Sequence, residues 1–589
     1  MKTKLIIVFF TVILFSGCIK DTLDRKPLNM ISDSDVWVSE RMVDLYMVTL
    51  YDNIMVGHQN SNINTYESTY TDESAYHGYN NTSGFGNSAI AVNTTMYNYI
   101  RKVNTALGRL KTATIAESSA KIRTAECRFI RAYYYFQLVK RYGGMPIIQD
   151  VQLFDNNLDA LQLPRNKEEE LYDFILNELD EAMADLPDAW DANNANRATK
   201  LVAQALKSRV ALYAGSIAKY GTVQLNGLIG IPASKANTYF TQSMNASRVV
   251  MESGKFGLYV KLYDPVSKSG DPSANYTQIF LDRNHNEVIF QKAYSYPDKV
   301  HGIDHKLVPE GFTTNYGSQI SPYLELAEAY EYIDGTPGIF NVEGKEFNTP
   351  DDLFKDKDPR FAATIFRLGT PHVGRAIDIY KGIYDTDGTL YSTVKVPFPK
   401  DPSRMQVGKD GPFEQGNGTR TGFYIRKFLS LSEIIVASGL SSQNYIDIRY
   451  AEILLNYAEA GIETGTDLPG ALDAINKVRN RAGIKLLDAS ELTIDRLRNE
   501  RRVELAFEDK RFWDMRRWRI GASLFRNTYM HGLYPYLKYT GTGYKYIYKK
   551  ISGYPLDAGF TKIWEEKDYY SNLSGYISTN KNIENNPGW

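Results

Sequence analysis

Two stretches of the chain combine tyrosines with polar side chains in a pattern suited to binding sugars. A sugar ring has an apolar face and a rim of hydroxyl groups, so it needs an aromatic surface beside hydrogen-bonding groups. Tyrosine on a loop supplies that surface at low entropic cost. For any one tyrosine, packing within the loop is the simpler interpretation, but for the region as a whole we favour binding. The candidate ligand residues are Tyr66, Tyr70, Asp72, Glu73, Tyr76, His77, Tyr79, Asn80, Asn81, Tyr294, Tyr296 and Tyr316.

Catalytic signatures are absent from the sequence. It has no Gly-x-Ser-x-Gly elbow, phosphate loop or His-Glu-x-x-His helix. Acidic residues are plentiful. However, the sequence does not single out two of them as the general acid and general base that a glycosidase holds at a fixed separation. His301 and His305 have the spacing of metal ligands on a helix, yet Pro297 and Gly302 disfavour a helix there. We therefore expect solvent-exposed loop histidines, and no catalytic residue, metal site or cofactor.

The densest charged motif runs from Arg498 to Glu508. Arg501, Glu504 and Glu508 are spaced for one helical face, and Arg511 follows three residues later, which permits ion pairs along a helix. One interpretation is a binding face for an anionic ligand. We favour a partly buried network that locks helix to helix, because the signs alternate and no phosphate-type loop precedes the motif.

The N terminus predicts export. Lys2 and Lys4 precede an apolar run from Leu5 to Phe15, and a basic start, a short apolar stretch and small residues describe a secretory signal. About eleven apolar residues are too few to cross a bilayer, which needs roughly 20. We therefore expect residues 1–17 to be a signal peptide that is removed.

Cys18 follows directly after Ser16 and Gly17. It resembles the lipobox cysteine of bacterial lipoproteins, which is acylated, with palmitate as an expected chain, and becomes the mature N terminus. A chance cysteine behind an ordinary signal is the alternative. With lipid on Cys18, Cys127 has no disulfide partner, so stability must come from a large core. Cys127 lies in a helical pattern and is expected to be a small buried residue.

Composition narrows the class of protein. Lys and Arg number 68 and Asp and Glu 69, without the basic excess that is typical of nucleic-acid binders. The 43 tyrosines in 589 residues suit contact surfaces and ligand walls, although many are expected in the core. No second apolar run approaches about 18 residues. We expect a soluble body on a tether.

Apolar periodicity predicts helices in both the early and late parts of the chain. The early ones form pairs that resemble tetratricopeptide-type hairpins, which bury one continuous core when stacked. Alternating Tyr544, Tyr546 and Tyr548 predict a short strand, and 287–290 is a short apolar run. The expected helices are 36–50, 96–111, 118–142, 167–186, 199–220, 236–253, 323–333, one beginning at Tyr445, 468–482, and one from Thr493 to Trp518 or beyond.

Loops occupy two blocks, 53–95 and 254–442, and loops that long in a compact protein are often functional. We expect the helical parts to pack together and the loop blocks to cover one side. The predicted fold is mainly α, with tetratricopeptide-like helix pairs and a large loop-rich, ligand-binding face. The predicted parts are a leader at 18–35 and a single body at 36–589, made of helical 36–253, loop-rich 254–442, and a C-terminal helical part with tail at 443–589.

Four stretches of the chain match one known pattern. They are the Cys18 lipobox with a leader containing Asp21, Leu23 and Pro27; Ala125–Phe136 continuing to Tyr142-Gly143-Gly144-Met145-Pro146; Arg449–Ala460; and Glu500–Trp518. Together they resemble the SusD/RagB family of outer-membrane lipoproteins from Bacteroidetes. The chain also ends in Asn-Pro-Gly-Trp, as many members do. It departs from the family pattern at Asn93, where Trp is frequent ahead of Tyr97, Ile100 and Asn104, and at Cys127, where Ala is commoner.

The resemblance implies a helical, tetratricopeptide-like fold with ligand residues in loops. It implies a lipid-anchored binding protein at the outer-membrane cell surface, without catalysis or nucleic-acid binding. The implied partner is a SusC-type TonB-dependent transporter, over which the lipoprotein sits like a lid. Capture of oligosaccharide for import is the leading hypothesis. Capture of peptides, a surface glycosidase or peptidase, and a scaffold without its own ligand are the alternatives.

Overall fold

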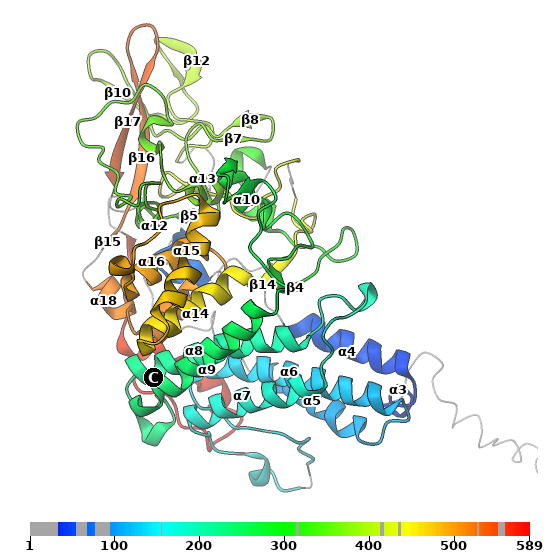
Figure 1. Cartoon of the computed structure of the whole chain (residues 1–589). Helices are drawn as coiled ribbons and strands as arrows, with labels where there is room; N and C mark the ends of the chain where they lie inside the picture. Colours follow the sequence, from blue (N-terminus) through cyan, green and yellow to red (C-terminus); the bar gives the residue numbers. More distant parts are fainter. Residues whose placement is uncertain are drawn as a thin grey trace, which may run out of the picture.

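The structure is a computed structural model, shown in Figure 1. Cys18, the expected signal peptide and the leader before Asp33 lie outside the residues that it describes. No helix in the described part of the chain is both long and apolar enough to cross a membrane. The described residues are 33–54, 67–76, 95–154, 156–313, 317–412, 418–433, 437–526, 529–551 and 560–589.

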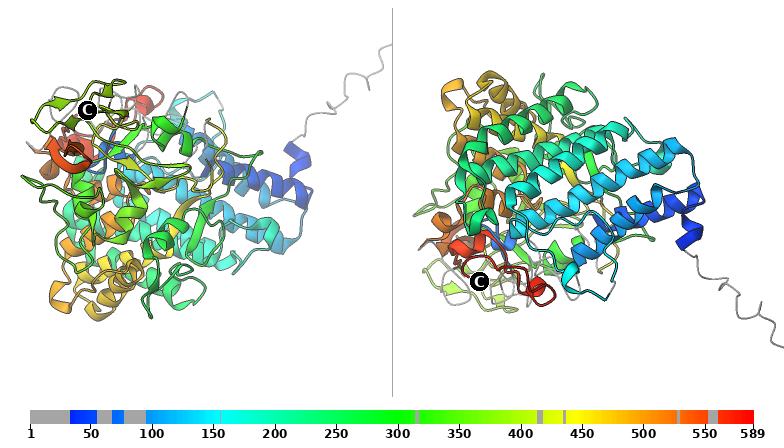
Figure 2. Two further views of the ribbon diagram at one scale, coloured as in Figure 1. Left: turned by 90° about the horizontal axis from the view of Figure 1, so that it is seen from above. Right: turned by 90° about the horizontal axis from the view of Figure 1, so that it is seen from below.

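The early part of the chain forms a layer of stacked helices. From α5 to α9, each helix packs against the next one in the chain, and together they form the broad face seen from below (Figure 2). The helices predicted from 96 to 253 are confirmed within one residue at each end, whereas the predicted 36–50 helix begins and ends four residues later. The helices are α3 (Asp33–Val36), α4 (Glu40–Ile54), α5 (Thr95–Leu110), α6 (Glu117–Tyr142), α7 (Glu168–Asp185), α8 (Lys200–Tyr220) and α9 (Ala236–Glu252).

Local signals set the ends of these helices. Thr199 caps α8, because its side chain accepts a hydrogen bond from the Val202 amide at 3.3 Å. Helix α6 ends at Gly143, whose φ of 75° favours glycine. At Gly144, an added Cβ would lie 1.9 Å from the Asn166 carbonyl oxygen. The two glycines therefore stop α6 and let the following chain pass close to α7.

The late helices pack on the early ones, as expected. Helix α14 lies against α8 and α9, and the central part of Figure 1 shows this stacking. The helix predicted at 468–482 is confirmed as α15, which ends at Gly483 with a φ of 75°. These helices are α14 (Tyr450–Thr464), α15 (Leu468–Ala482), α16 (Ile494–Glu504), α17 (Arg511–Arg517), α18 (Gly521–Phe525) and α19 (Ser574–Ile577).

Three predicted helices were wrong in extent. Tyr445 begins strand β14 (Tyr445–Arg449), which pairs with β4 (Val288–Lys292) from the loop-rich part. The helix expected from Thr493 to Trp518 breaks between α16 and α17. At that break Phe507 has a φ of 61°, and the Glu504 carbonyl accepts a hydrogen bond from Arg449 at 2.7 Å. The helix expected at 323–333 shortens to α12 (Leu324–Ala329).

The loop-rich part contains short helices and small sheets. Its largest sheet has the order β10-β9-β16-β17, and the tyrosine alternation near Tyr544 is confirmed as part of β17. The remaining elements are α10 (Pro272–Gln278), α11 (Ile303–Leu307), α13 (Pro359–Thr364), β1 (Ser74–Tyr76), β2 (Tyr263–Asp264), β3 (Ser269–Gly270), β5 (Ile320–Pro322), β6 (Ile365–Phe366), β7 (Pro371–His372), β8 (Arg375–Ala376), β9 (Ile383–Tyr384), β10 (Leu390–Tyr391), β11 (Pro397–Phe398), β12 (Asp401–Met405), β13 (Tyr424–Ile425), β15 (Tyr529–Met530), β16 (Gly532–Tyr539), β17 (Tyr544–Ile551) and β18 (Phe560–Thr561).

The main hydrophobic core lies between the helices, and a second core lies under the loop-rich part. Many tyrosines are core residues, as expected: Tyr134, Tyr142 and Tyr172 are among the largest fully buried side chains. Cys127 is completely buried, with its sulfur 3.8 Å from that of Met47. This confirms its expected role as a small buried residue in a helix contact.

Candidate ligand-binding face

A short antiparallel strand pair joins the two loop blocks. In the register of β1 with β5, Tyr76 stands opposite Ile320 and Ser74 opposite Pro322. The Tyr323 amide extends the pairing by donating to the Glu73 carbonyl at 2.9 Å. The segment 67–76, which carries candidate residues of the first block, therefore lies beside 317–323 of the second block.

Asp72 and Glu73 hold this strand pair in place from inside the protein. Asp72 is 1% exposed and accepts from Nε and Nη2 of Arg511, both at 2.8 Å, while Arg502 lies 2.9 Å away. Burial alone would raise the pKa of Asp72, but Arg502 and Arg511 outweigh burial and lower it. The Glu73 carboxyl accepts from the Phe507 amide at 3.1 Å. Both side chains therefore fix the loop instead of facing a ligand, which corrects their assignment as candidate ligand residues.

A buried lysine completes this anchor. Nζ of Lys562 donates to the Thr69 carbonyl at 2.7 Å, to the Ser74 carbonyl at 3.2 Å and to that of Thr71. Burial lowers the pKa of Lys562 to about 7. An anchor with this many bonds holds the 67–76 segment firmly against the rest of the protein.

The other candidate residues of the first block divide into two groups. Tyr70 is half-buried, and its ring meets that of Phe512 edge-on with centroids 6.4 Å apart. Tyr76 is also half-buried, at the end of β1. Both positions leave part of the ring accessible. The candidates outside the described residues are Tyr66, His77, Tyr79, Asn80 and Asn81, and Tyr316 of the second block.

Tyr294 and Tyr296 have opposite environments. Tyr294 is 2% exposed and packs edge-on against His301, with centroids 4.6 Å apart, so it is a core residue and its assignment as a ligand residue is corrected. Tyr296 is 64% exposed. It lies in a tight turn closed by the bridge between Ser295 and Lys299, with a cis peptide bond before Pro297. The turn presents the Tyr296 ring to solvent.

Backbone hydrogen bonds link the Tyr296 turn to the β1–β5 pair. His301 pairs with Ser441 beside the turn. Helix α11 follows, and its Lys306 carbonyl accepts from the Gln319 amide at 3.1 Å, directly before β5. The segments that carry the tyrosines of the two blocks are thus joined by backbone hydrogen bonds. We call these joined segments, 67–76, 294–307 and 317–323, the loop face.

His301 and His305 are not the solvent-exposed loop histidines that we expected. They are 5% and 8% exposed, and the Nε2 atom of His301 lies 2.9 Å from the Gln443 carbonyl oxygen. Burial lowers the pKa of His301 to about 4, so it is neutral at physiological pH. Among the described residues no group of three or more His, Cys, Asp or Glu side chains is arranged to hold a metal ion. These histidines therefore pack the base of the loop face.

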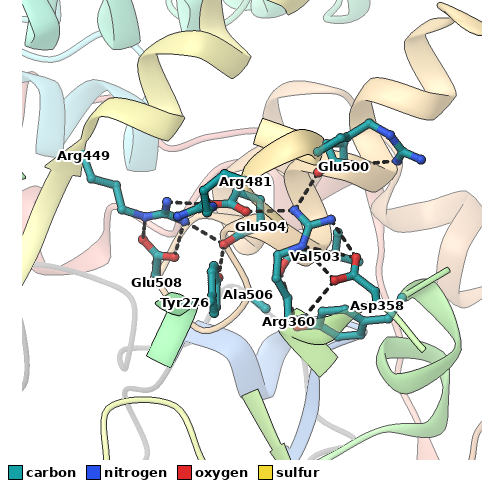
Figure 3. A network of polar contacts seen from close by, with 12 residues as sticks. Tyr276, Asp358, Arg360, Arg449, Arg481, Glu500, Val503, Glu504, Ala506 and Glu508 are labelled. Atoms are coloured by element: carbon teal, nitrogen blue, oxygen red, sulfur yellow. Dashed lines mark hydrogen bonds and ion pairs between the residues drawn. The ribbon is translucent and has the colours of Figure 1, made fainter. Parts of the chain in front are cut away.

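The charged motif at 498–508 is the structural network that we favoured. Figure 3 shows Glu504 among three arginines: it accepts from Arg449 at 2.5 Å, from Arg360 at 2.8 Å and from Arg481. Burial would raise the pKa of Glu504, but Arg481, Arg449 and Arg360 outweigh burial and lower it. The expected continuation of one helical face to Arg511 was wrong, because the break after Glu504 turns Arg511 toward Asp72 instead.

Sequence reasoning missed aromatic residues on the four-stranded sheet. Nζ of Lys549 on β17 donates to the hydroxyl of Tyr384 on β9 at 2.6 Å and lies 4.7 Å from the centre of its ring. Tyr536 lies beside Tyr384, with centroids 5.6 Å apart. The alternation at 544–548 was the only signal in the sequence, and it did not show which strand β17 would meet.

Comparison with known proteins identifies the fold as that of SusD-like proteins. A solved SusD-like protein from Bacteroides fragilis superimposes with a TM-score of 0.70 at 26% identity, over 96% of this chain and 100% of that one. A SusD-like protein of Bacteroides ovatus is 25% identical over 535 residues, 88% of this chain and 83% of the relative. A solved laminarin binding SusD-like protein has a TM-score of 0.59 at 18% identity, over 94% of this chain and 100% of that one.

Family models cover most of the chain. The model described as the SusD family matches residues 286–589, just over half of the sequence. A second model, described as starch-binding associating with outer membrane, matches residues 21–212. The chain belongs to the SusD family.

Proposed function

We propose that this protein is a lipoprotein of the outer-membrane cell surface that binds glycans and captures oligosaccharide for import. Lipid on Cys18 holds it at the membrane, and a SusC-type TonB-dependent transporter receives the captured ligand. The observation that carries the proposal is the loop face of a SusD-family chain, where β1 and β5 join two tyrosine-bearing loops on a rigid helical scaffold.

The named relatives support a carbohydrate ligand. One solved structure is of a SusD-like carbohydrate binding protein from Bacteroides fragilis, and another is of surface glycan-binding protein A from Bacteroides uniformis. The second family model is described as starch-binding. Each description concerns the related protein, and the shared scaffold makes a glycan the first ligand to test here.

The chemistry of the loop face favours binding over hydrolysis. Tyr296 offers an exposed aromatic ring against which a sugar can stack. The neighbouring carboxylates Asp72 and Glu73 are buried and bonded to the protein itself. A glycosidase needs two carboxyl groups that reach the glycosidic bond, and neither of these does so. The face therefore suits capture without cleavage.

Replacement of Tyr296 by Ala tests the loop face. We expect the purified protein to be retarded in gels containing one or more members of a panel of neutral and acidic glycans. Y296A should weaken that binding by about two- to thirteenfold, because stacking on an aromatic ring contributes about 0.5–1.5 kcal/mol. Calorimetry with an oligosaccharide of the glycan that retards the protein most measures the dissociation constant of each variant.

Phe154 provides the matched control. It is 66% exposed and follows a segment that bonds to α5, where Arg101 donates to the Gln152 carbonyl at 2.7 Å, so F154A should bind like the unchanged protein. Binding of peptides with silence toward every glycan would replace the glycan proposal with peptide capture. Equal loss of glycan binding in both variants would show that the loop face is not the binding site.

The proposed transporter partner is tested separately. We expect a SusC-type transporter to copurify with the protein from outer-membrane extracts.

A further inference from the structure

A cavity is lined by residues outside the three segments of the loop face. It has a volume of about 410 Å³ and opens between the end of α8, helix α18 and the C-terminal tail. In Figure 1, α18 and the C-terminus lie at the left, whereas β4 and β14, beside the Tyr296 turn, lie near the centre. We call it the tail cavity. Among its lining residues are Tyr220, Arg519, Arg526, Lys567, Tyr569 and Tyr570.

The walls of the tail cavity combine aromatic rings with positive charge. The guanidinium carbon of Arg519 lies 4.7 Å from the ring centres of both Tyr569 and Tyr570, and its Nη2 donates to the Tyr570 hydroxyl at 2.6 Å. Nη1 of Arg519 is buried and has no hydrogen-bond partner among the described residues. A guanidinium has five N–H donors in a planar fork suited to carboxylate, phosphate or sulfate oxygens.

A second arginine lies beneath the first. Arg516 is 3% exposed, and its three side-chain nitrogens have no hydrogen-bond partner in the described part of the chain. It lines an inner cavity of about 10 Å³, which shares Arg519, Tyr569 and Tyr570 with the tail cavity. Burial, reinforced by Arg519 and Arg141, lowers the pKa of Arg516 to about 9. Arg516 still carries its charge at physiological pH. The fold therefore holds a buried guanidinium without hydrogen-bond partners among the described residues, next to the tail cavity.

The acidic groups nearby form no hydrogen bond or ion pair with these two arginines in the described part of the chain. Glu168 accepts from the Tyr570 hydroxyl at 2.7 Å and from the Gly230 amide. Asp568 accepts from the Glu565 amide at 2.7 Å, and its charge partly offsets the lowering of the Arg516 pKa. Glu566 lines the tail cavity. Among the side chains that line the two cavities, those of Lys and Arg outnumber those of Asp and Glu.

We propose that the tail cavity is a second binding site, which takes an anionic ligand of about disaccharide size. Arg519 binds its carboxylate or sulfate group, Arg516 strengthens the local positive potential, and the tyrosines pack against the body of the ligand. The volume and the mixed aromatic and cationic walls match an acidic sugar better than a bare ion, which would need no apolar surface. This site is independent of the proposed function of the loop face.

Calorimetry on the purified protein at constant ionic strength tests the site with sodium glucuronate, sodium sulfate and neutral glucose. We expect glucuronate or sulfate to bind and glucose to be silent. If glucuronate binds more tightly than sulfate, the sugar ring contributes to binding and the ligand is an acidic sugar. If the two bind equally, the cavity binds a free oxyanion and the sugar ring contributes nothing. Absence of binding by both anions overturns the proposal.

Variants assign the binding to the cavity. R519Q should weaken binding of the anion by about ten- to hundredfold, because it removes charged hydrogen bonds. K567Q should weaken binding of the anion by a smaller factor. Thermal unfolding shows whether R519Q folds, and K567Q replaces it as the test variant if it does not. K581Q is the matched control, since Lys581 is an exposed lysine of the same tail that pairs with Asp159 outside the cavity. Binding that is unchanged in folded R519Q and in K567Q overturns the proposal.

The loop-face variant separates the two sites. Y296A should leave anion binding at the tail cavity unchanged, while R519Q should leave glycan retardation by the loop face unchanged. Loss of anion binding in Y296A would place the anion on the loop face and overturn the second site. Failure of the loop face to bind glycan would leave the anion result intact.

Discussion

Two buried arginine clusters in this protein are centred on residues close together in the chain, Glu504 and Arg516, and differ in whether their charges are paired. Around Glu504, the arginines Arg360, Arg449 and Arg481 bond directly to carboxylates. Around Arg516, only a dozen residues later, the guanidinium has aromatic neighbours and no hydrogen-bond partner among the described residues. The first cluster joins α16 to α13, β14 and α15, whereas the second leaves positive charge available to a ligand.

The comparison shows why a count of charges does not locate function. A buried ion pair with complete hydrogen bonds is costly to break, because the remaining partner stays desolvated without compensation. A buried charge without a partner costs stability in the free protein and can recover that cost by binding. The predictions below test this difference between a complete network and an incomplete one.

The largest effect is expected from Glu504→Gln. Removing this charge leaves three buried arginines facing a neutral amide, so the free energy of unfolding should fall by about 3–5 kcal/mol. Urea unfolding followed by circular dichroism measures the change. D473N is the control, because the Asp473–Lys477 pair is exposed and its loss should cost at most about 0.5 kcal/mol. Similar small changes in both variants would contradict a structural role for the network.

Glu73 should give a smaller, pH-dependent effect. Burial and the neighbouring Asp72 charge raise the pKa of Glu73 from its ordinary 4.5 to about 8. A carboxyl raised on folding stabilises the protein fully below its unfolded pKa, and this contribution is lost as the pH rises toward the folded value. The contribution of Glu73 to the free energy of unfolding should therefore fall between about pH 5 and about pH 7, on the order of 3 kcal/mol.

Glu73→Gln should flatten that fall, because an amide has no proton to lose. Urea unfolding at about pH 5 and about pH 7 measures both proteins. His301, with its pKa lowered to about 4, and Lys562, with its pKa lowered to about 7, give slopes of the opposite sign. Both groups are present in the two proteins, so the difference between the two slopes isolates Glu73. The same slope in both proteins would show that Glu73 ionises normally.

Arg516→Met should give the smallest effect, in the opposite direction to Glu504→Gln. An apolar side chain of similar length removes an unsatisfied buried cation, so the free energy of unfolding in low-salt buffer should rise by about 1–3 kcal/mol. Added sulfate should stabilise the unchanged protein more than R516M, because a ligand that binds only the folded state shifts the unfolding equilibrium. A loss of stability in R516M as large as in E504Q would erase the difference between the two clusters.

Short-range features of the fold were predictable from the sequence. Thr199 before α8, the glycines after α6 and Gly483 after α15 act on backbone groups within a few residues, so their positions along the chain suffice. The break between α16 and α17 was not predictable, because bonds from Arg449 and Tyr276 to the Glu504 carbonyl come from distant elements. Strand β14 was missed for the same reason, since its partner β4 lies far back in the chain.

The candidate site was predictable as a region and not residue by residue. Tyr294 and Tyr296 are two positions apart in the sequence, yet one is buried and the other exposed. Asp72 looked like a ligand residue because its partner Arg511 lies 439 residues further along the chain. Periodicity reports which side of a helix or strand is apolar, but not which distant segment will cover it.

The sequence by itself determined the family motifs, the helical layer and the alternating charges of 498–508, because these depend on residue types and short spacings. Only the tertiary structure decided which of those charges are neutralised. It also decided that β1 meets β5 and that Arg516 and Arg519 sit beneath a cavity closed by the C-terminal tail. Burial and pairing are relations between segments distant in the chain, and they set the energy of each charge and the accessibility of each ring.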